Sequence, residues 1–193
     1  PAEAIDLLYG RQLSVAVLAE DSIAKSILSF SKTHLFEDPY VLAVPKAISL
    51  ENIQNLEELK NSAESKVLSN IIQFEFGNQH KRRIEEWFTS VLPNSRVFAK
   101  TRTYEVALSM VQSGRGVAVV PALAARLGGK KLDFDVNLYK TNLPQRKIIS
   151  LIPSQYVRIE PYKSFIESLV ATGKNMQLPK ANAVPPILES LSV

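Results

Sequence analysis

Residues 103–121 read TYEVALSMVQSGRGVAVVP and contain the strongest structural signal in the chain. The first half places apolar residues at helical spacing, which predicts an amphipathic helix from about Tyr104. Residues 117–120 form a continuous apolar run that stops at Pro121, as expected of a buried strand. A helix that leads through a turn with Gly114 and Gly116 into a buried strand is typical of an α/β fold.

The same alternation of strands and helices extends along the chain and predicts largely parallel sheets. The expected strands are residues 13–18, 40–44, 67–76, 96–100, 117–120, 136–139 and 147–152. The expected helices are residues 2–9 before Gly10, 55–60, 79–91, one from about Tyr104, one from Pro121 to Gly128, and one from Pro161. Beyond Gly173 the periodic signals stop, so residues 176–193 are expected to be an extended tail, mobile unless it docks.

The composition limits the chemistry available to the chain. With 193 residues, 46% of them hydrophobic, the chain can bury the core of one domain or of two small lobes. It has no cysteine, which excludes disulfides, thiol nucleophiles and thiolate metal sites, and only two histidines, His34 and His80. The net charge of +4 is too small to indicate nucleic-acid binding by these residues alone. We expect no metal, no cofactor and no membrane segment.

Three segments together carry a family resemblance. Residues 10–17, GRQLSVAV, place a glycine and polar residues before an apolar strand, with Ser14 where the family usually has Asp. Residues 35–45, LFEDPYVLAVP, and the stretch 103–121 described above follow in order and at the usual spacing. From residue 2 to about 173 the chain resembles the effector-binding domain of LysR-type transcriptional regulators.

The resemblance implies an α/β fold like that of type 2 periplasmic binding proteins, in which two Rossmann-like lobes are joined by two crossover strands and the ligand binds in the cleft. Lobe one is expected to hold residues 1–45 and 147–175, lobe two residues 46–146, and the tail residues 176–193. The crossovers are expected near Pro45 and residues 145–147. Lobe one is expected to be incomplete, because the family's sensing domain opens with a further strand, helix and strand.

The implied function is to sense a small-molecule effector and to couple it to gene regulation in the cytoplasm. Family members assemble as homodimers or homotetramers in the full-length protein. They contact promoter DNA only through an N-terminal winged helix-turn-helix, which these residues do not include.

The candidate effector site centres on residues 73–80, which lead into the expected helix 79–91. Free backbone N–H groups and the helix dipole favour an anion such as a carboxylate there. The candidate effector-binding residues are Gln73, Phe74, Asn78, Gln79, His80, Thr101, Thr103, Pro121, Ala19 and Glu20. The alternatives are plain capping by Asn78 and Thr103, a solvent-exposed His80, and a Pro121 that only begins a helix. Glu20 opposes an anionic ligand and favours a basic one.

Two other functions remain open. A solute-binding protein of a transport system has the same fold but requires export, and no signal sequence is visible. An enzyme is not expected, since Gly114 and Gly116 are too few glycines for a phosphate-binding loop. The adjacent carboxylates Glu85 and Glu86 are interpreted as surface charges, the basic run at residues 81–83 as a solvated helix face, and Trp87 as core.

Overall fold

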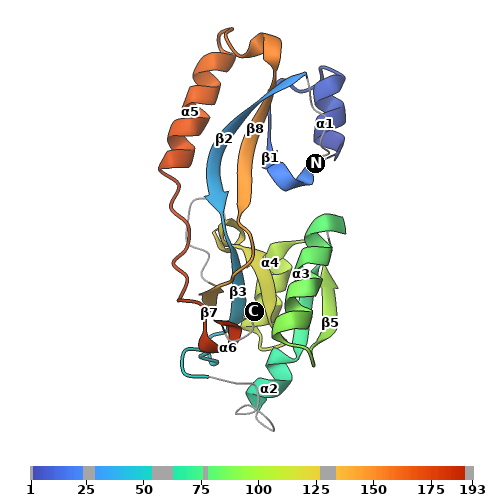
Figure 1. Cartoon of the computed structure of the whole chain (residues 1–193), viewed down its shortest axis with the longest axis vertical. Helices are drawn as coiled ribbons and strands as arrows, with labels where there is room; N and C mark the ends of the chain where they lie inside the picture. Colours follow the sequence, from blue (N-terminus) through green and yellow to red (C-terminus); the bar gives the residue numbers. More distant parts are fainter. Residues whose placement is uncertain (1, 24–28, 54–62, 76–77, 127–133, 190–193) are drawn as a thin grey trace. The chain divides into compact units, whose positions relative to one another are not determined.

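The computed structural model describes residues 2–23, 29–53, 63–75, 78–126 and 134–189. The chain forms two compact units, Pro1–Asp38 with Gln145–Gln177 and Pro39–Pro144 with Leu178–Val193. Each unit combines helices with a sheet (Figure 1), which confirms the predicted α/β class. None of the helices in these ranges is long and apolar enough to cross a membrane.

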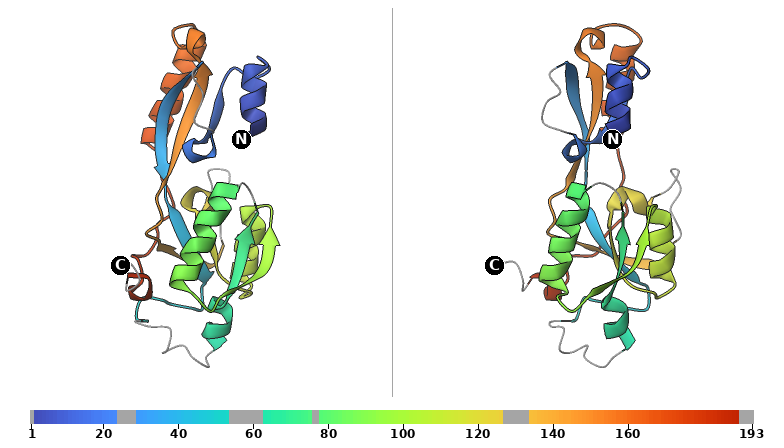
Figure 2. Two further views of the ribbon diagram at one scale, coloured as in Figure 1. Left: turned by 45° about the vertical axis from the view of Figure 1, so that its right-hand side comes forward. Right: turned by 90° about the vertical axis from the view of Figure 1, so that its right-hand side faces the viewer.

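Unit 1 is a three-stranded antiparallel sheet in the order β1-β8-β2 with a helix on each side (Figures 1 and 2). Leu8 of the first helix packs with Ala16, Ile149 and Leu151 of the strands, while the last helix packs against β2. In chain order the elements are α1 (Ala2–Tyr9), β1 (Ala16–Ala19), the 3₁₀ turn η1 (Glu20–Ser22), β2 (Phe30–Asp38), β8 (Arg146–Pro153), η4 (Ser154–Tyr156) and α5 (Tyr162–Lys174).

The helix α1 ends at Gly10 as predicted, although the left-handed residue is its neighbour Arg11, with φ 57°. The Gln12 N–H donates to the Leu7 carbonyl at 2.8 Å and the Arg11 N–H to the Leu8 carbonyl at 3.2 Å. This pair of bonds is the Schellman motif, which satisfies carbonyls that the helix leaves open.

The strand β2 was not expected from the sequence. Its register against β8 shifts between His34 and Phe36, so the alternation of apolar and polar residues is broken within the strand. A bulge of this kind removes the period-2 signal by which a strand is recognised.

Unit 2 contains one mixed sheet. Its antiparallel part has the order β6-β3-β7, its parallel part is β4-β5, and bonds of Ile72 N–H to the Val117 carbonyl and Val117 N–H to the Asn70 carbonyl join the two parts. The elements are β3 (Tyr40–Pro45), α2 (Ala63–Leu68), β4 (Asn70–Phe74), α3 (Asn78–Val91), β5 (Arg96–Thr101), α4 (Tyr104–Gln112), β6 (Ala118–Pro121), η3 (Ala122–Ala125), β7 (Val136–Lys140) and α6 (Pro186–Glu189).

Helices α3 and α4 cover opposite faces of this sheet (Figure 2). Tyr40, Leu42 and Val44 of β3 pack in the cluster that includes α3, whereas Val41 and Ala43 pack in the cluster with α4. The strand is therefore buried on both faces, which explains its uninterrupted apolar sequence. Trp87 is core, as predicted.

The two glycines of the turn at residues 114–116 have different roles. Gly114 has φ +70° and ends α4, with its N–H donating to the Val111 carbonyl at 2.9 Å. A Cβ on Gly116 would lie 2.3 Å from the Asn70 carbonyl oxygen, so only glycine allows this close approach to β4.

Three expectations need correction. The sheets are not largely parallel: that of unit 1 is antiparallel, because β8 pairs antiparallel with both β1 and β2, and that of unit 2 is mixed, because β3 pairs antiparallel with β6 and β7. The helix α2 occupies residues 67–68, which were expected to begin a strand, since a short apolar pair does not distinguish the two. Between Pro121 and Arg126 the chain forms the 3₁₀ turn η3 and not the expected α-helix. The expected helix at residues 55–60 and the helix end at Gly128 lie outside the described residues.

The boundaries of the units also differ from the expected lobes. The chain crosses between units at Asp38–Pro39, at Pro144–Gln145 and at Gln177–Leu178, so β3 belongs to unit 2. The tail docks on unit 2 in its described part, where Asn182 bonds with both Leu138 and Lys140 of β7 and Ile187 is buried in the core. The sequence of the tail has no helical or strand periodicity, so the burial of its apolar residues could not be predicted.

Candidate functional site

The carboxyl ends of β4 and β5 place three of the candidate residues on two faces of one sheet. The parallel register places Gln73 beside Lys100 and Phe74 beside Thr101. Ile72 packs with the α4 cluster and Ile71 with the α3 cluster. Since side chains alternate along a strand, Phe74 and Thr101 lie on the α4 face and Gln73 lies on the α3 face.

The α4 face combines an aromatic pair with a buried hydroxyl. The ring of Phe74 stacks on that of Tyr104, with centroids 3.9 Å apart and an interplanar angle of 22°. Thr101 is only 6% exposed, and its Oγ1 has no hydrogen-bond partner within the described part of the chain. A buried hydroxyl without a partner is costly, so a group that can bond with it is expected to approach.

The N-terminus of α4 follows directly on this strand end. Thr103 is the N-cap residue, and its Oγ1 accepts a bond from the Val106 N–H at 3.4 Å. The capping interpretation of Thr103 is therefore confirmed. The other N–H groups of the first turn leave a partial positive charge two residues beyond Thr101.

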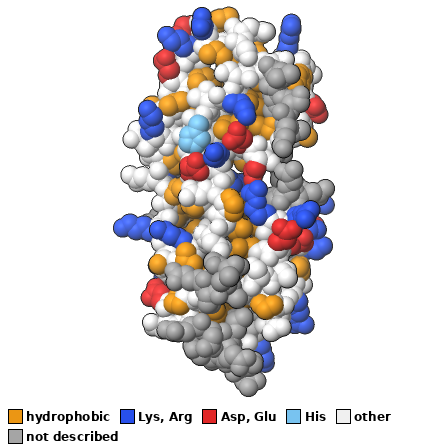
Figure 3. Space-filling model, viewed as in Figure 1, with side chains coloured by type: hydrophobic (Ala, Val, Ile, Leu, Met, Phe, Trp, Pro, Cys, Tyr) orange, Lys and Arg blue, Asp and Glu red, His pale blue; other side chains and the backbone are white. Residues whose placement is uncertain are grey.

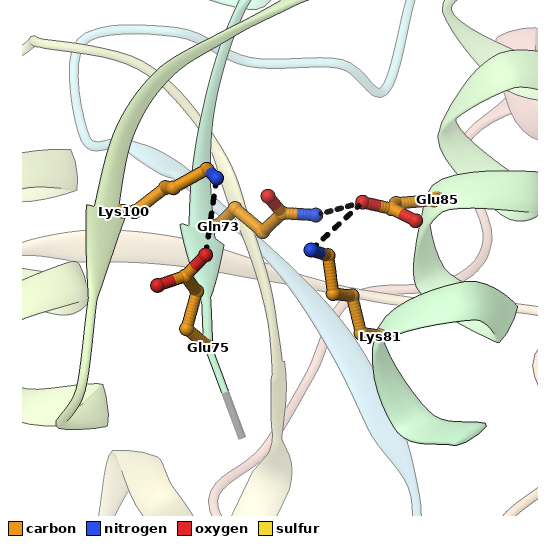
Figure 4. Close-up of polar contacts among 5 residues, drawn as sticks. All are labelled: Gln73, Glu75, Lys81, Glu85 and Lys100. Atoms are coloured by element: carbon orange, nitrogen blue, oxygen red, sulfur yellow. Dashed lines mark hydrogen bonds and ion pairs between the residues drawn. The ribbon is translucent and has the colours of Figure 1, made fainter. Parts of the chain in front are cut away.

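The α3 face holds a polar group that sequence reasoning missed. Gln73 is 5% exposed, and its Nε2 donates to Glu85 Oε1 at 2.6 Å (Figure 4). Lys81 Nζ lies 3.9 Å from the same oxygen. Gln73 is thus separated from Thr101 by the sheet. Glu85 is exposed, as predicted for it and for its neighbour Glu86, and its carboxylate also accepts the bond from Gln73. Nothing in the local sequence around Glu85 indicates this partner.

A second ion pair lies on the same face, where Lys100 Nζ is 3.0 Å from Glu75 Oε1 (Figure 4). The hydrogen bond and the charge of Lys100 lower the pKa of Glu75, and the charges of Lys81 and Arg102 act in the same direction. Glu75 is therefore ionised at neutral pH, in surroundings with several cations.

The remaining candidates fall into three groups. Asn78, Gln79 and His80 open α3 as predicted, but their side chains lie outside the described residues. Pro121 is buried at the end of β6, opposite Tyr40, and precedes the turn η3. Ala19 ends β1, and Glu20 begins η1 in unit 1, where the carboxylate of Glu20 accepts a bond from Lys32 at 3.1 Å.

The basic run at residues 81–83 matches the expected solvated helix face for Arg82, whose exposed side chain pairs with Glu86 at 2.7 Å. Acidic and basic side chains are interspersed over the face seen in Figure 3, in keeping with the small net charge. Within the described residues, no group of three or more His, Cys, Asp or Glu side chains is arranged to hold a metal ion.

Comparisons with known proteins agree with this architecture. Residues 1–173 match the family described as the LysR substrate binding domain. The regulatory domain of reduced OxyR from Pseudomonas aeruginosa is 16% identical with a TM-score of 0.60, over 93% of this chain and 80% of that one. The CcmR regulatory domain of Synechocystis, solved in complex with 2-PG, is 13% identical with a TM-score of 0.65, over 90% of this chain and 80% of that one.

The LysR family transcriptional regulator CbnR is 13% identical with a TM-score of 0.58, and the match covers 89% of this chain and 56% of that one. No curated protein matches the sequence. The predicted two-lobed fold of type 2 periplasmic binding proteins is confirmed by these neighbours. The chain therefore belongs to the LysR substrate binding domain family and is an effector-binding domain of a LysR-type transcriptional regulator.

Proposed function

We propose that the effector is a small anionic metabolite and that it contacts unit 2 at the carboxyl ends of β4 and β5, on the α4 face. The observation that carries this proposal is the hydroxyl of Thr101, which is buried and lacks a partner among the described residues. A carboxylate or phosphate oxygen is a good acceptor for this hydroxyl, and the adjacent N-terminus of α4 favours negative charge.

The charges around the strand ends support an anion. Arg102, which directly follows Thr101 in the sequence, helps to lower the pKa of Glu75 and so adds positive charge at this strand end, whereas Lys100 and Lys81 lie on the α3 face. The stacked rings of Phe74 and Tyr104 offer an apolar surface beside the hydroxyl. In the related CcmR domain the fold was solved in complex with 2-PG, which shows that a small molecule binds that protein.

Binding alone does not produce a signal. The effector must bind one conformation of the domain more tightly than another, so that the population shifts and the change reaches DNA-bound partners. In this proposal the domain binds its metabolite without turnover, works in the cytoplasm as part of a homodimer or homotetramer, and reaches promoter DNA through a winged helix-turn-helix elsewhere in the regulator.

A thermal-shift screen with small carboxylates, phosphorylated acids, amino acids and aromatic acids tests the proposal. A ligand that binds only the native state raises the melting temperature by mass action. Thr101→Val is expected to abolish most of the ligand-induced rise in melting temperature. The control Thr33→Val, at a half-buried position on β2 of unit 1, is expected to show the same rise as the wild type. Equal ligand-induced rises in the wild type and in Thr101→Val would overturn the assignment of the site.

A further inference from the structure

A pocket of about 150 Å³ lies between α3 and the β4-β5 strands. Its apolar lining consists of Ile71, Ile84, Phe88, Leu92, Pro93 and Val97. Because this lining belongs to the α3 face of the sheet, the pocket is separated by the sheet from Phe74 and Thr101. The proposed effector contacts do not use it.

The walls of the pocket are well-packed core. Ile71, Phe88 and Leu92 are each less than 10% exposed and belong to the cluster built around α3. Val97 of β5, which is 45% exposed, marks the open side. An apolar cavity of about 150 Å³ is large enough for a benzene-sized molecule. The pocket therefore suits a ligand whose apolar part is one aromatic ring or a branched aliphatic group.

The polar part of the lining includes Gln73 and Glu85. The Gln73 amide nitrogen donates to Glu85 Oε1 at 2.6 Å (Figure 4). This bond leaves the side-chain carbonyl oxygen of Gln73 and Glu85 Oε2 as acceptors, and no described residue donates a hydrogen bond to either. Two acceptors, one of them a carboxylate, call for a cationic donor such as an ammonium group.

Charge favours a cation over an anion next to Glu85. The half-exposed carboxylate is ion-paired with Lys81 Nζ at 3.9 Å, a separation too long for a close hydrogen bond. An ammonium group in the pocket can therefore donate a close hydrogen bond to Glu85, which Lys81 does not.

We propose that this pocket binds a small primary amine with an apolar body of about one ring, as a second ligand of the domain. The apolar body lies against Ile71, Phe88 and Leu92, and the ammonium group donates to Glu85 and to the Gln73 carbonyl oxygen. The ligand class differs from the proposed anionic effector, and the site lies on the other face of the sheet.

Titration of the chain with benzylamine, followed by two-dimensional NMR of the backbone amides, tests this proposal. The expected result is saturable shifts in residues 71–73 and 84–92, with Glu85→Gln weakening binding by about tenfold or more. Glu86→Gln is the matched control, because Glu86 is the next carboxylate on the same helix, pairs with Arg82 and does not line the pocket. Val97→Trp, which fills the open side, is expected to block binding.

Three results would overturn the proposal: equal losses in Glu85→Gln and Glu86→Gln, benzoate binding as tightly as benzylamine, or shifts that avoid α3. Thr101→Val separates this proposal from the effector proposal. It is expected to leave benzylamine binding unchanged while abolishing the response to the anionic effector, so either proposal can fail alone.

Discussion

Phe74 at the end of β4 lies directly opposite Thr101 at the end of β5 in the parallel ladder. The Phe74 ring is in turn stacked on Tyr104, the first residue of α4. This arrangement encloses the Thr101 hydroxyl beside a helix N-terminus and explains why a side chain at a strand end is only 6% exposed. Among the described residues this hydroxyl has no hydrogen-bond partner, and under the proposed function it contacts a ligand atom.

Thr101→Val and Thr103→Val are expected to change stability in opposite directions. The first removes a buried hydroxyl that lacks a described partner and is expected to raise the free energy of unfolding by about 1 kcal/mol. The second removes the N-cap bond to Val106 and is expected to lower it by about 1 kcal/mol. Urea unfolding of the ligand-free variants measures both. A destabilised Thr101→Val variant would show that the hydroxyl already has a partner.

The strand register at this site explains which of its features could be predicted from the sequence and which could not. The helix α3, the strand β5 and the cap at Thr103 follow from local patterns and are confirmed. The register of β4 against β5 shifts between Ile71 and Ile72, and this shift brings Thr101 opposite Phe74. Without the shift Phe74 would face Lys100. An irregularity of one residue has no local signature, so the pairing could not be predicted.

Contacts between residues far apart in the sequence could not be predicted either, because they too have no local signature. Gln73 was predicted as an effector ligand, but its place on the strand turns it to the α3 face, where it meets Glu85. Sequence periodicity gives the face of a residue relative to its own strand, not which helix covers that face. The docked tail, with Ile187 in the core, shows the same limit.

The ion pair of Asp38 and Arg146 is expected to be a major local contribution to the stability of unit 1. Arg146 Nη2 lies 2.5 Å from Asp38 Oδ2, and the Asp38 side chain is fully buried. Arg146→Met leaves that carboxylate without this partner and is expected to lower the free energy of unfolding by about 3–5 kcal/mol. Lys147→Met, at the exposed neighbouring position, is the control. Similar unfolding curves for the two variants in guanidinium chloride would contradict the account.

Gly173→Ala tests the packing of α5 on β2. A Cβ at residue 173 would lie 2.4 Å from the Leu35 carbonyl oxygen. Helix propensity alone predicts stabilisation by about 1 kcal/mol for this change. The contact predicts destabilisation by about 1–3 kcal/mol through overpacking. The sign of the change in thermal or chemical unfolding decides between them, and a stabilised variant would refute the close approach.

The pKa of Glu160 is lowered, first by the Ser164 hydroxyl, which donates to its carboxylate at 2.7 Å, and then by the Ser164 N–H. A lowered pKa in the folded state means that the stabilisation is fully present above the ordinary pKa and is lost as pH falls through the lowered value. Ser164→Ala is expected to raise the pKa of Glu160 towards its ordinary range. Carboxyl-carbon NMR titration of both proteins measures this, and an unmoved pKa would count against the contact.

The most direct test of the central claim is two-dimensional NMR of the backbone amides during titration with the tightest-binding anion from the ligand screen. The account predicts that the largest shifts within unit 2 occur at Phe74, Thr101 and the first turn of α4, and that Thr101→Val abolishes them. Saturable binding that leaves these amides unmoved, or that is equally tight in Thr101→Val, would contradict the claim that the effector binds at the carboxyl ends of β4 and β5.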